Sequence, residues 1–485
     1  MANDGQKDPI GDNAPTGNGR PINLDVEGDD RNTETRDQSH GVKDAGQKGD
    51  APKTTDRSGY YNEDDLHVWK DRYLRRNEDP SRRDPKTGGM SAPKKITFKY
   101  YHVTLNIGHP PKPYFLDIDT GSDLTWLQCD APCIKCTRAP HALYKPNKNL
   151  VRCEDPLCAS LHWPANKPCE TPDDQCDYEI EYADHGSSMG VLIRDSFPLR
   201  LINGSVAGPR LIFGCGYNQE VPDSFDPPYT DGVLGLTGGQ LSIVSQLHKQ
   251  GITRNILGHC LSGKGGGFLF FGNDLVPSSR VVWVPMLLNS LEKRYVLGPT
   301  ELLYGNRATG VKGLLVVFDS GSTYSYLSSD AYKATLAIVK EDLNGKQLKD
   351  AVEDQNLPVC WKGAKPFKSI HDVKNYFKPL VLRFTKPKNM QLQLPPSAYL
   401  IITKHGNACL GILNGSEVGL GNDNILGDIS LQDKMVIYDN EKQQIGWVAA
   451  NCDRLLKTDR DYIGGSSQPF ASNMDILEEH LKEEL

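Results

Sequence analysis

The sequence of 485 residues contains no long apolar run. Its longest apolar stretches, such as residues 281–288, fall far short of the roughly 20 residues that a transmembrane helix needs. An excess of positive charge is missing too, because 55 Lys and Arg residues face 62 Asp and Glu residues. The resulting formal charge of −7 argues against a nucleic-acid-binding protein, which would present a basic face. We therefore expect neither a transmembrane segment nor a nucleic-acid partner.

Apolar residues are scarce in the first 60 positions, which hold 12 acidic and 8 basic residues but only 7 of Ile, Leu, Val, Met, Phe, Trp and Tyr. Such a segment buries too little apolar surface to offset its ordering entropy, so residues 1–94 are predicted to be mostly disordered. Within them, Leu66, Trp69 and Tyr73 recur at helical spacing between charges. Residues 63–83 are therefore either a basic, propeptide-like segment or a solvated linker. The charged residues 454–485 are predicted to form a flexible acidic tail.

The features of a secretory signal are also missing from residues 1–20, which show neither a basic start nor an apolar run of about 7–15 residues. The cysteines indicate the opposite. All twelve lie between Cys129 and Cys452, and an even number with one dense cluster is typical of disulfides formed in an oxidising compartment. We give the cysteines more weight and expect a protein of the secretory pathway, extracellular or vacuolar.

Seven of the cysteines fall between Cys129 and Cys176, so they cannot all pair among themselves. If all twelve are oxidised, an odd number of the seven must bridge to the other five. Cys133 and Cys136 could instead form half of a zinc site, but no second pair at this spacing accompanies them. We therefore expect no metal.

The composition is rich in turn-forming residues, with 46 glycines and 32 prolines, which is typical of an all-β fold. From about residue 95 to residue 448, short β-branched and aromatic segments alternate with Gly, Pro and Asn breaks. Clear helical patterns are few and fall at residues 241–250 and 329–343. The chain is thus predicted to be a β protein with a few short helices.

Two segments 200 residues apart have the same pattern, FLDIDTGSDLTWL at residues 115–127 and LVVFDSGSTYSYL at residues 315–327. Each is an apolar strand followed by Asp, a hydroxyl residue, Gly and Ser. A strand of this kind delivers a carboxylate to the edge of a core, Gly permits a sharp turn, and the hydroxyls can hold the carboxylate by hydrogen bonds. Either segment alone is more simply an Asp-Gly turn, whereas the pair predicts chemistry.

Two carboxylates that face each other cannot both ionise, so they share one proton. The charged member can act as a base on water while the protonated member donates to a carbonyl. A second repeat supports a duplicated lobe, because GVLGL at residues 232–236 follows the first aspartate at an offset similar to that of NILGD at residues 424–428 after the second.

These residues resemble the pepsin-like aspartic proteases, and within them the plant nucellin-like branch that has no saposin-like insert. The resemblance covers about residues 98–453 and also rests on Trp126, on FGCG at residues 213–216 and on IGW at residues 445–447. It implies an all-β, bilobal fold, with an N-terminal lobe at residues 95–288 and a C-terminal lobe at residues 289–453. It also implies a monomeric endopeptidase that acts on polypeptides at acidic pH without a cofactor.

The resemblance assigns roles to the repeat. Asp119 and Asp319 are the implied catalytic dyad. The implied supporting residues are Thr120, Gly121 and Ser122 in the first lobe, and Ser320, Gly321 and Ser322 in the second. A flap is implied at residues 178–192, where Tyr182 and Gly186 contact substrate and Trp126 orients Tyr182. Asp184 and His185 replace the short tip of pepsins.

The resemblance further implies a disulfide between Cys360 and Cys409 and another between Cys215 and Cys452. Independently of it, Asn203 and Asn414 each begin an Asn-Gly-Ser glycosylation sequon. One alternative function stays open, a catalytically silent binding or inhibitor protein on the same fold. Retention of both aspartates, both glycines and the flap tyrosine favours the enzyme.

Overall fold

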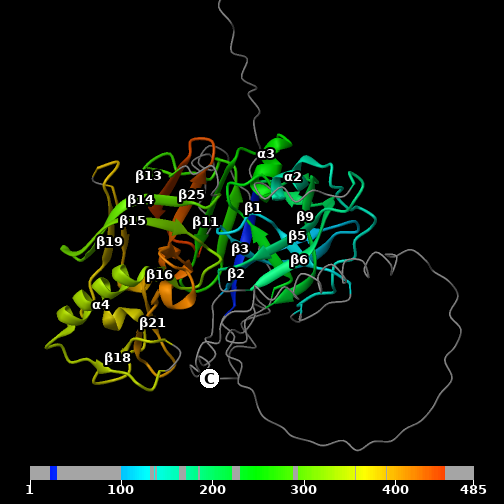
Figure 1. Ribbon diagram of the computed structural model, residues 1–485. Coiled ribbons are helices and arrows are strands. Elements are labelled where there is room, and N and C mark those ends of the chain that lie inside the picture. The colour runs from blue at the N-terminus through cyan, green and yellow to red at the C-terminus, as the bar shows by residue number, and fades with distance from the viewer. Residues whose placement is uncertain are drawn as a thin grey trace, which may run out of the picture. The chain divides into compact units, whose positions relative to one another are not determined.

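The computed structural model describes residues 22–29, 100–131, 136, 139–162, 171–183, 186–220, 230–287, 293–354, 357–388 and 390–453. Strands dominate this part of the chain, as predicted, and Figure 1 shows how they are arranged. No helix in these ranges is long and apolar enough to cross a membrane. The predictions for residues 63–83 and for the tail at residues 454–485 lie outside the described residues.

The largest sheet has 13 strands, in the order β13-β26-β25-β11-β12-β1-β2-β3-β10-β4-β9-β6-β5. Most of its strands come from the first half of the chain, and β25 and β26 come from the C-terminal end. The bounds are β1 Ile22–Asp29, β2 Tyr100–Ile107, β3 Lys112–Asp119, β4 Trp126–Gln128, β5 Asp177–Glu181, β6 Ser187–Ser196, β9 Arg210–Glu220, β10 Gly232–Gly235, β11 Ile256–Leu261, β12 Gly267–Phe271, β13 Val282–Pro285, β25 Lys434–Asp439 and β26 Gln444–Ala449.

The second half of the chain forms a seven-stranded sheet, β20-β19-β14-β15-β24-β16-β23, and a four-stranded sheet, β17-β18-β22-β21. The two-stranded hairpin β7-β8 belongs to the first half. The bounds are β7 Leu199–Arg200, β8 Val206–Ala207, β14 Val296–Tyr304, β15 Arg307–Phe318, β16 Ser325–Leu327, β17 Lys349–Asp350, β18 Cys360–Lys362, β19 Leu380–Phe384, β20 Gln391–Leu394, β21 Leu400–Ile402, β22 Ala408–Leu410, β23 Ile412–Asn414 and β24 Ile425–Leu426.

The described helices are short, and two of them match the helical patterns in the sequence. They are α2 Pro156–His162, α3 Ile243–Lys249, α4 Ser329–Leu343 and α5 Asp428–Leu431, with 3-10 turns η2 Ile370–Val373, η3 Pro396–Ala398 and η4 Gly415–Val418. Ser242 caps α3, because its side chain accepts a hydrogen bond from the backbone N–H of Ser245. In α4 the buried residues, among them Ala331, Thr335, Ile338 and Val339, follow the helical period and face the neighbouring strands.

The sequence repeat corresponds to a structural repeat. In the first half, β3 pairs in parallel with β10, β10 pairs antiparallel with β4, and β4 pairs in parallel with β9. In the second half, β15, β24, β16 and β23 are connected by the same sequence of parallel and antiparallel pairings. In each unit the strand that leads to the aspartate, β3 or β15, lies beside the strand of the second sequence repeat, β10 or β24. The duplicated lobe predicted from the sequence is therefore a repeated four-strand unit.

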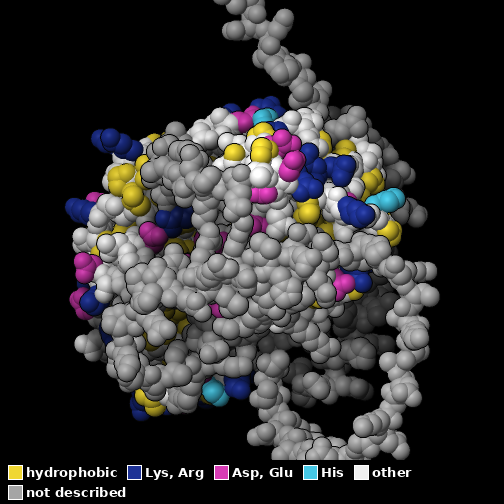
Figure 2. Space-filling view, turned by 45° about the vertical axis from the view of Figure 1, so that its right-hand side comes forward, with side chains coloured by type: hydrophobic (Ala, Val, Ile, Leu, Met, Phe, Trp, Pro, Cys, Tyr) yellow, Lys and Arg dark blue, Asp and Glu magenta, His cyan; other side chains and the backbone are white. Residues whose placement is uncertain are grey.

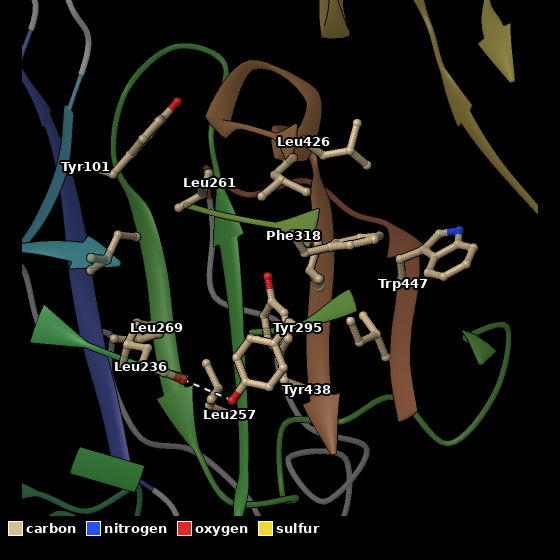
Figure 3. Close-up of a cluster of buried hydrophobic side chains, with 14 of the residues drawn as sticks. Tyr101, Leu236, Leu257, Leu261, Leu269, Tyr295, Phe318, Leu426, Tyr438 and Trp447 are labelled. Atoms are coloured by element: carbon tan, nitrogen blue, oxygen red, sulfur yellow. Dashed lines mark hydrogen bonds between the residues drawn. The ribbon is translucent and has the colours of Figure 1, made fainter. Parts of the chain in front are cut away.

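One hydrophobic core runs through both halves (Figure 3). Leu236, Leu257 and Leu269, which precede residue 289, pack in it with Phe318 and Tyr438, which follow it. The hairpin β25-β26 makes this possible, because β25 pairs with β11 along residues 435–439 and so carries the end of the chain into the sheet of the first half. The tyrosine just before β14, Tyr295, donates its hydroxyl hydrogen to the carbonyl of Leu236 at 2.9 Å.

Strand β1 was not predicted. It pairs antiparallel with both β12 and β2, so residues 22–29 occupy an interior position in the large sheet. The prediction of disorder does not hold for these eight residues. They contain an alternation of apolar residues, Ile22, Leu24 and Val26, that the composition of a 60-residue window hides.

The disulfides correct one predicted pairing. Cys360 pairs with Cys409, as the resemblance implied, because β18 and β22 place them directly opposite each other. The implied pair Cys215–Cys452 is wrong. Cys129 follows β4, which lies beside β9, and therefore bonds Cys215, whereas Cys452 bonds Cys260 on β11. The bridge from Cys129 is the outward bridge that the odd number in the cluster requires, because Cys260, Cys360, Cys409 and Cys452 pair with one another.

The cysteine cluster contains further disulfides. Cys158 pairs with Cys176, and Cys136 and Cys153 are also disulfide-bonded.

On the face shown in Figure 2, basic, acidic and apolar side chains are interspersed wherever described residues reach the surface. This mixture agrees with the moderate net charge of the sequence.

Candidate active site

The two repeated aspartates meet where the aspartate strands of the two halves end. Asp119 is the last residue of β3, and Asp319 directly follows β15. Each carboxyl group packs against the glycine of the other repeat: a Cβ atom added to Gly121 would lie 2.6 Å from Oδ1 of Asp319, and one added to Gly321 would collide with Oδ1 of Asp119. Any side chain larger than hydrogen at these glycines would force the carboxyl groups apart.

Each carboxyl group is held by its own turn in the same way. The backbone N–H of Gly121 donates to Oδ1 of Asp119 at 2.8 Å, and the N–H of Gly321 donates to Oδ1 of Asp319 at 2.9 Å. The hydroxyl of Ser122 donates to Oδ2 of Asp119, and that of Ser322 donates to Oδ2 of Asp319 at 2.9 Å. Two donors on each carboxylate fix its rotamer and stabilise its charged form.

The hydroxyl residues after the aspartates connect the two halves. Thr120 donates its hydroxyl hydrogen to the carbonyl of Phe318 at 3.0 Å and accepts from the N–H of Ser320 at 2.9 Å. Ser320 reciprocates, donating to the carbonyl of Ile118 at 2.9 Å and accepting from the N–H of Thr120 at 3.1 Å. Both side chains are fully buried. This four-bond lock sets the relative position of the two carboxyl groups.

Burial and mutual repulsion change the acidity of the pair. Desolvation is the largest cause that raises the pKa of Asp119 to about 7, and the charge of Asp319 is the second. Hydrogen bonds from Ser122 and Gly121 act in the opposite direction and lower this pKa. Desolvation also raises the pKa of Asp319, and hydrogen bonds from Ser322 and Gly321 oppose it. The hydrogen bond between the two carboxyl groups raises the pKa of Asp119 and lowers that of Asp319. The two carboxyl groups therefore titrate as one coupled pair, which holds a proton more tightly than an isolated aspartate does.

The residues of the predicted flap lie near the two aspartates, because the charge of Asp119 acts on Tyr182. Strands β5 and β6 form a hairpin, and Tyr182 after β5 accepts a hydrogen bond from the indole Nε1–H of Trp126 at 2.7 Å. Desolvation, followed by the charge of Asp119, raises the pKa of the Tyr182 hydroxyl well above its ordinary value. Gly186 accepts from the N–H of Tyr182 at 2.7 Å and closes the turn. Asp184 and His185, at the tip, lie outside the described residues.

Sequence reasoning gave no role to two further carboxyl groups. Asp117, on β3, and Asp428, the first residue of α5, are both buried, and each faces the charges of Asp119 and Asp319. The sequence contained a signal for them: in the aligned repeats, each stands where the other half has an apolar residue, Val317 or Leu236. A comparison of the two repeats position by position would have identified both.

The other predicted sites are the two glycosylation sequons and a possible metal site. Asn203 is exposed in the turn of the β7-β8 hairpin, whereas Asn414 is 6% exposed and donates to Glu417 at 2.8 Å. Among the described residues, one group has the spacing of metal ligands, Asp354 with Cys360 and Cys409. Those two cysteines form a disulfide and therefore offer no thiolate.

Comparison with known proteins supports the same interpretation of the fold. Two family models match the chain, described as Xylanase inhibitor N-terminal at residues 101–273 and Xylanase inhibitor C-terminal at residues 298–449. An aspartic proteinase of rice (Oryza sativa subsp. japonica) is 47% identical over 373 residues, which cover 74% of this chain and 90% of that protein. Aspartic proteinase 36 of Arabidopsis thaliana is 29% identical over 397 residues, covering 77% and 78%.

Two solved structures share the fold at low sequence identity. Basic 7S globulin from soybean superposes with a TM-score of 0.57 at 16% identity, covering 74% of this chain and 96% of that one. The aspartic proteinase from Irpex lacteus superposes with a TM-score of 0.52 at 18% identity, covering 73% and 95%. With the rice relative nearly half identical over most of its length, the chain belongs to the plant family of pepsin-like aspartic proteases.

Proposed function

We propose that this protein is an aspartic-type endopeptidase that hydrolyses peptide bonds of polypeptides at acidic pH. The observation that carries the proposal is the reciprocal packing of each aspartate carboxyl group against the glycine of the other repeat, which makes Asp119 and Asp319 one unit. Neither carboxyl group needs a metal or a cofactor to share a proton with the other.

The proposed reaction uses the unequal acidity of the pair. The ionised Asp319 takes a proton from a water molecule, whose oxygen attacks the peptide carbonyl carbon, while Asp119 donates its proton to the carbonyl oxygen. The tetrahedral intermediate then collapses: the C–N bond breaks, the leaving nitrogen takes a proton from Asp319, and Asp119 recovers its proton from the intermediate's hydroxyl. One water is consumed, and the pair returns to its starting state. In this proposal Tyr182 covers the substrate, and Trp126 orients the Tyr182 side chain through their hydrogen bond.

The pH dependence follows from the same assignment. Activity requires one proton on the pair, and it is lost as the pH rises through the pKa of Asp119, about 7. At low pH, protonation of Asp319 removes the base. We therefore expect a bell-shaped profile with its maximum in the acid range.

The test is cleavage of a denatured protein by the full-length chain at acid pH, with and without a statine inhibitor that mimics the tetrahedral intermediate. Asp119→Asn and Asp319→Asn should each lower kcat by at least about 10³-fold, because each removes a general acid or base. Asp350→Asn, an exposed carboxyl on β17, is the matched control and should retain full activity. Undiminished cleavage by either dyad variant would refute the assignment.

One alternative, a silent binding protein, rests on the description of the matching family models as xylanase inhibitor domains. The same assay separates the two, because a silent protein would show no statine-sensitive cleavage at any pH. For location, the disulfides favour the secretory pathway, extracellular or vacuolar, because such bonds form and persist in oxidising compartments.

A further inference from the structure

Two buried carboxyl groups that the proposed reaction does not use lie beside the dyad. Asp117 precedes Asp119 by two residues on β3, so both side chains lie on the same face of the strand. Asp428 begins α5, and its backbone N–H donates to the carbonyl of Ser322 at 2.7 Å, next to the hydroxyl that bonds Asp319. The side chains of Asp117 and Asp428 are 8% and 3% exposed. Each half of the molecule thus contributes one extra carboxyl group next to its own aspartate.

The repeated architecture shows that the fold does not require carboxyl groups at these positions. Val317 stands two residues before Asp319, where the first half has Asp117, and Leu236 follows Gly235, where the second half has Asp428 after Gly427. Val317 and Leu236 are 5% and 0% exposed, so the same backbone positions bury apolar side chains in the other half. Burying a carboxyl group instead of an apolar one is costly unless it is neutral or paired.

The described Lys and Arg side chains do not neutralise the two groups. In the described part of the chain no ion pair joins either carboxylate to Lys or Arg, and Oδ1 of Asp428 is buried without a hydrogen-bond partner. Lys434, the cation on β25, donates to the carbonyls of Ser430 and Gln432, so it is engaged at the opposite end of α5. On β2, His102 lies opposite Asp117 in the strand register.

The charges that do face the two carboxyl groups are mostly acidic. Burial, followed by the charges of Asp119 and Asp319, raises the pKa of Asp117 well above its ordinary value, and a backbone hydrogen bond at Ile118 opposes this. Burial, followed by the charges of Asp117, Asp319 and Asp119, does the same to the pKa of Asp428. The hydroxyls of Tyr182 and Tyr438 are further ionisable groups near them, because the charge of Asp117 acts on Tyr182 and the charge of Asp428 acts on Tyr438.

We propose that Asp117 and Asp428 together act as an acid sensor: the folded protein keeps both protonated, and it loses stability as the pH rises toward neutral. In the unfolded chain both groups ionise at the ordinary pKa of Asp, about 4. Below that pH neither group contributes. Above it, the unfolded state releases protons that the folded state retains, so the unfolding constant rises about tenfold per pH unit for each retained proton. The loss of stability ends once the pH exceeds the pKa that the two carboxyl groups have in the folded state.

The experiment follows urea unfolding by circular dichroism between pH 4.5 and pH 7, which needs no catalytic activity and so separates this inference from the proposed function. Asp117→Asn and Asp428→Asn each remove one group that the folded state keeps protonated. The logarithm of the unfolding constant should therefore rise by about one unit less per pH unit in each variant than in the wild type. The exposed control Asp350→Asn should keep the wild-type slope, because its carboxylate is solvated before and after unfolding.

A second set of variants uses the residues that the fold itself buries at these positions. Asp117→Val and Asp428→Leu should reduce the slope as the Asn variants do, so the result does not depend on how Asn fits. Wild-type slopes in both sets would overturn the proposal. So would a shift of the pH–activity profile with an unchanged slope, because the pair would then act on the charge of the dyad and not on the stability of the fold.

Discussion

The hydroxyl lock between Thr120 and Ser320 offers a sharp test of how the two halves are held in register. Thr120→Val keeps the shape of the side chain but removes its hydroxyl. It leaves the carbonyl of Phe318 and the N–H of Ser320 without partners in a fully buried position. An unsatisfied buried group costs about 1–3 kcal/mol, so the variant should lose about 2–6 kcal/mol of unfolding free energy.

The repeat supplies the matched control, because the second half has serine where the first has threonine. Thr120→Ser keeps the hydroxyl and both hydrogen bonds and loses only one buried methyl group, which is worth about 1 kcal/mol. The difference between the Val and Ser variants therefore measures the hydroxyl and not the packing.

The assay is urea unfolding at acid pH, where the carboxyl groups are protonated in both states, followed by kcat and KM on a peptide substrate. We expect Thr120→Val to lower kcat by about 10²-fold, because a small displacement of the reacting carboxyl groups has an effect of this size. Thr120→Ser should stay close to wild type. A Val variant within about 0.5 kcal/mol of the Ser variant would refute the claim that the four hydrogen bonds set the register.

Two further predictions concern the flap and the surface. Trp126→Phe and Tyr182→Phe each remove the 2.7 Å hydrogen bond between these residues, so each should lower kcat/KM for peptide hydrolysis about fivefold. In a double-mutant cycle the double variant should lose no more than either single variant. After expression in a secretory host, Asn203→Gln should remove one glycan from the intact mass and Asn414→Gln none, because only Asn203 is exposed; the reverse pattern would contradict the exposed turn.

The fold class and the aspartate pair could be predicted because each depends on local pattern. The repeated strand-Asp-hydroxyl-Gly-Ser segment needs both glycines for the close approach of Asp119 and Asp319, and that requirement is visible in the letters. The same holds for α4, whose predicted bounds equal the observed Ser329–Leu343. Local pattern is sufficient where the physical constraint is local.

The pairing of Cys215 and the strand β1 depend on long-range register, which the sequence does not display. Cys215 bonds Cys129 because β4 and β9 run in parallel side by side, a neighbour relation that no count of cysteines determines. Strand β1 is held by backbone hydrogen bonds to β12 and β2, which lie more than 70 residues away along the chain. Composition averaged over a long window therefore hid an eight-residue strand.

The two buried carboxyl groups beside the dyad, Asp117 and Asp428, bear on whether the protein is a scaffold or an enzyme. A scaffold gains nothing from them, because Val317 and Leu236 show that the same positions bury apolar side chains, and each carboxyl group held protonated destabilises the fold as the pH rises. Local rules of stability are broken in this way mainly where chemistry requires it. The cost is lowest in an acidic compartment, where the proposed shared proton is also retained, so one pH range suits both the stability of the fold and the reaction of the dyad.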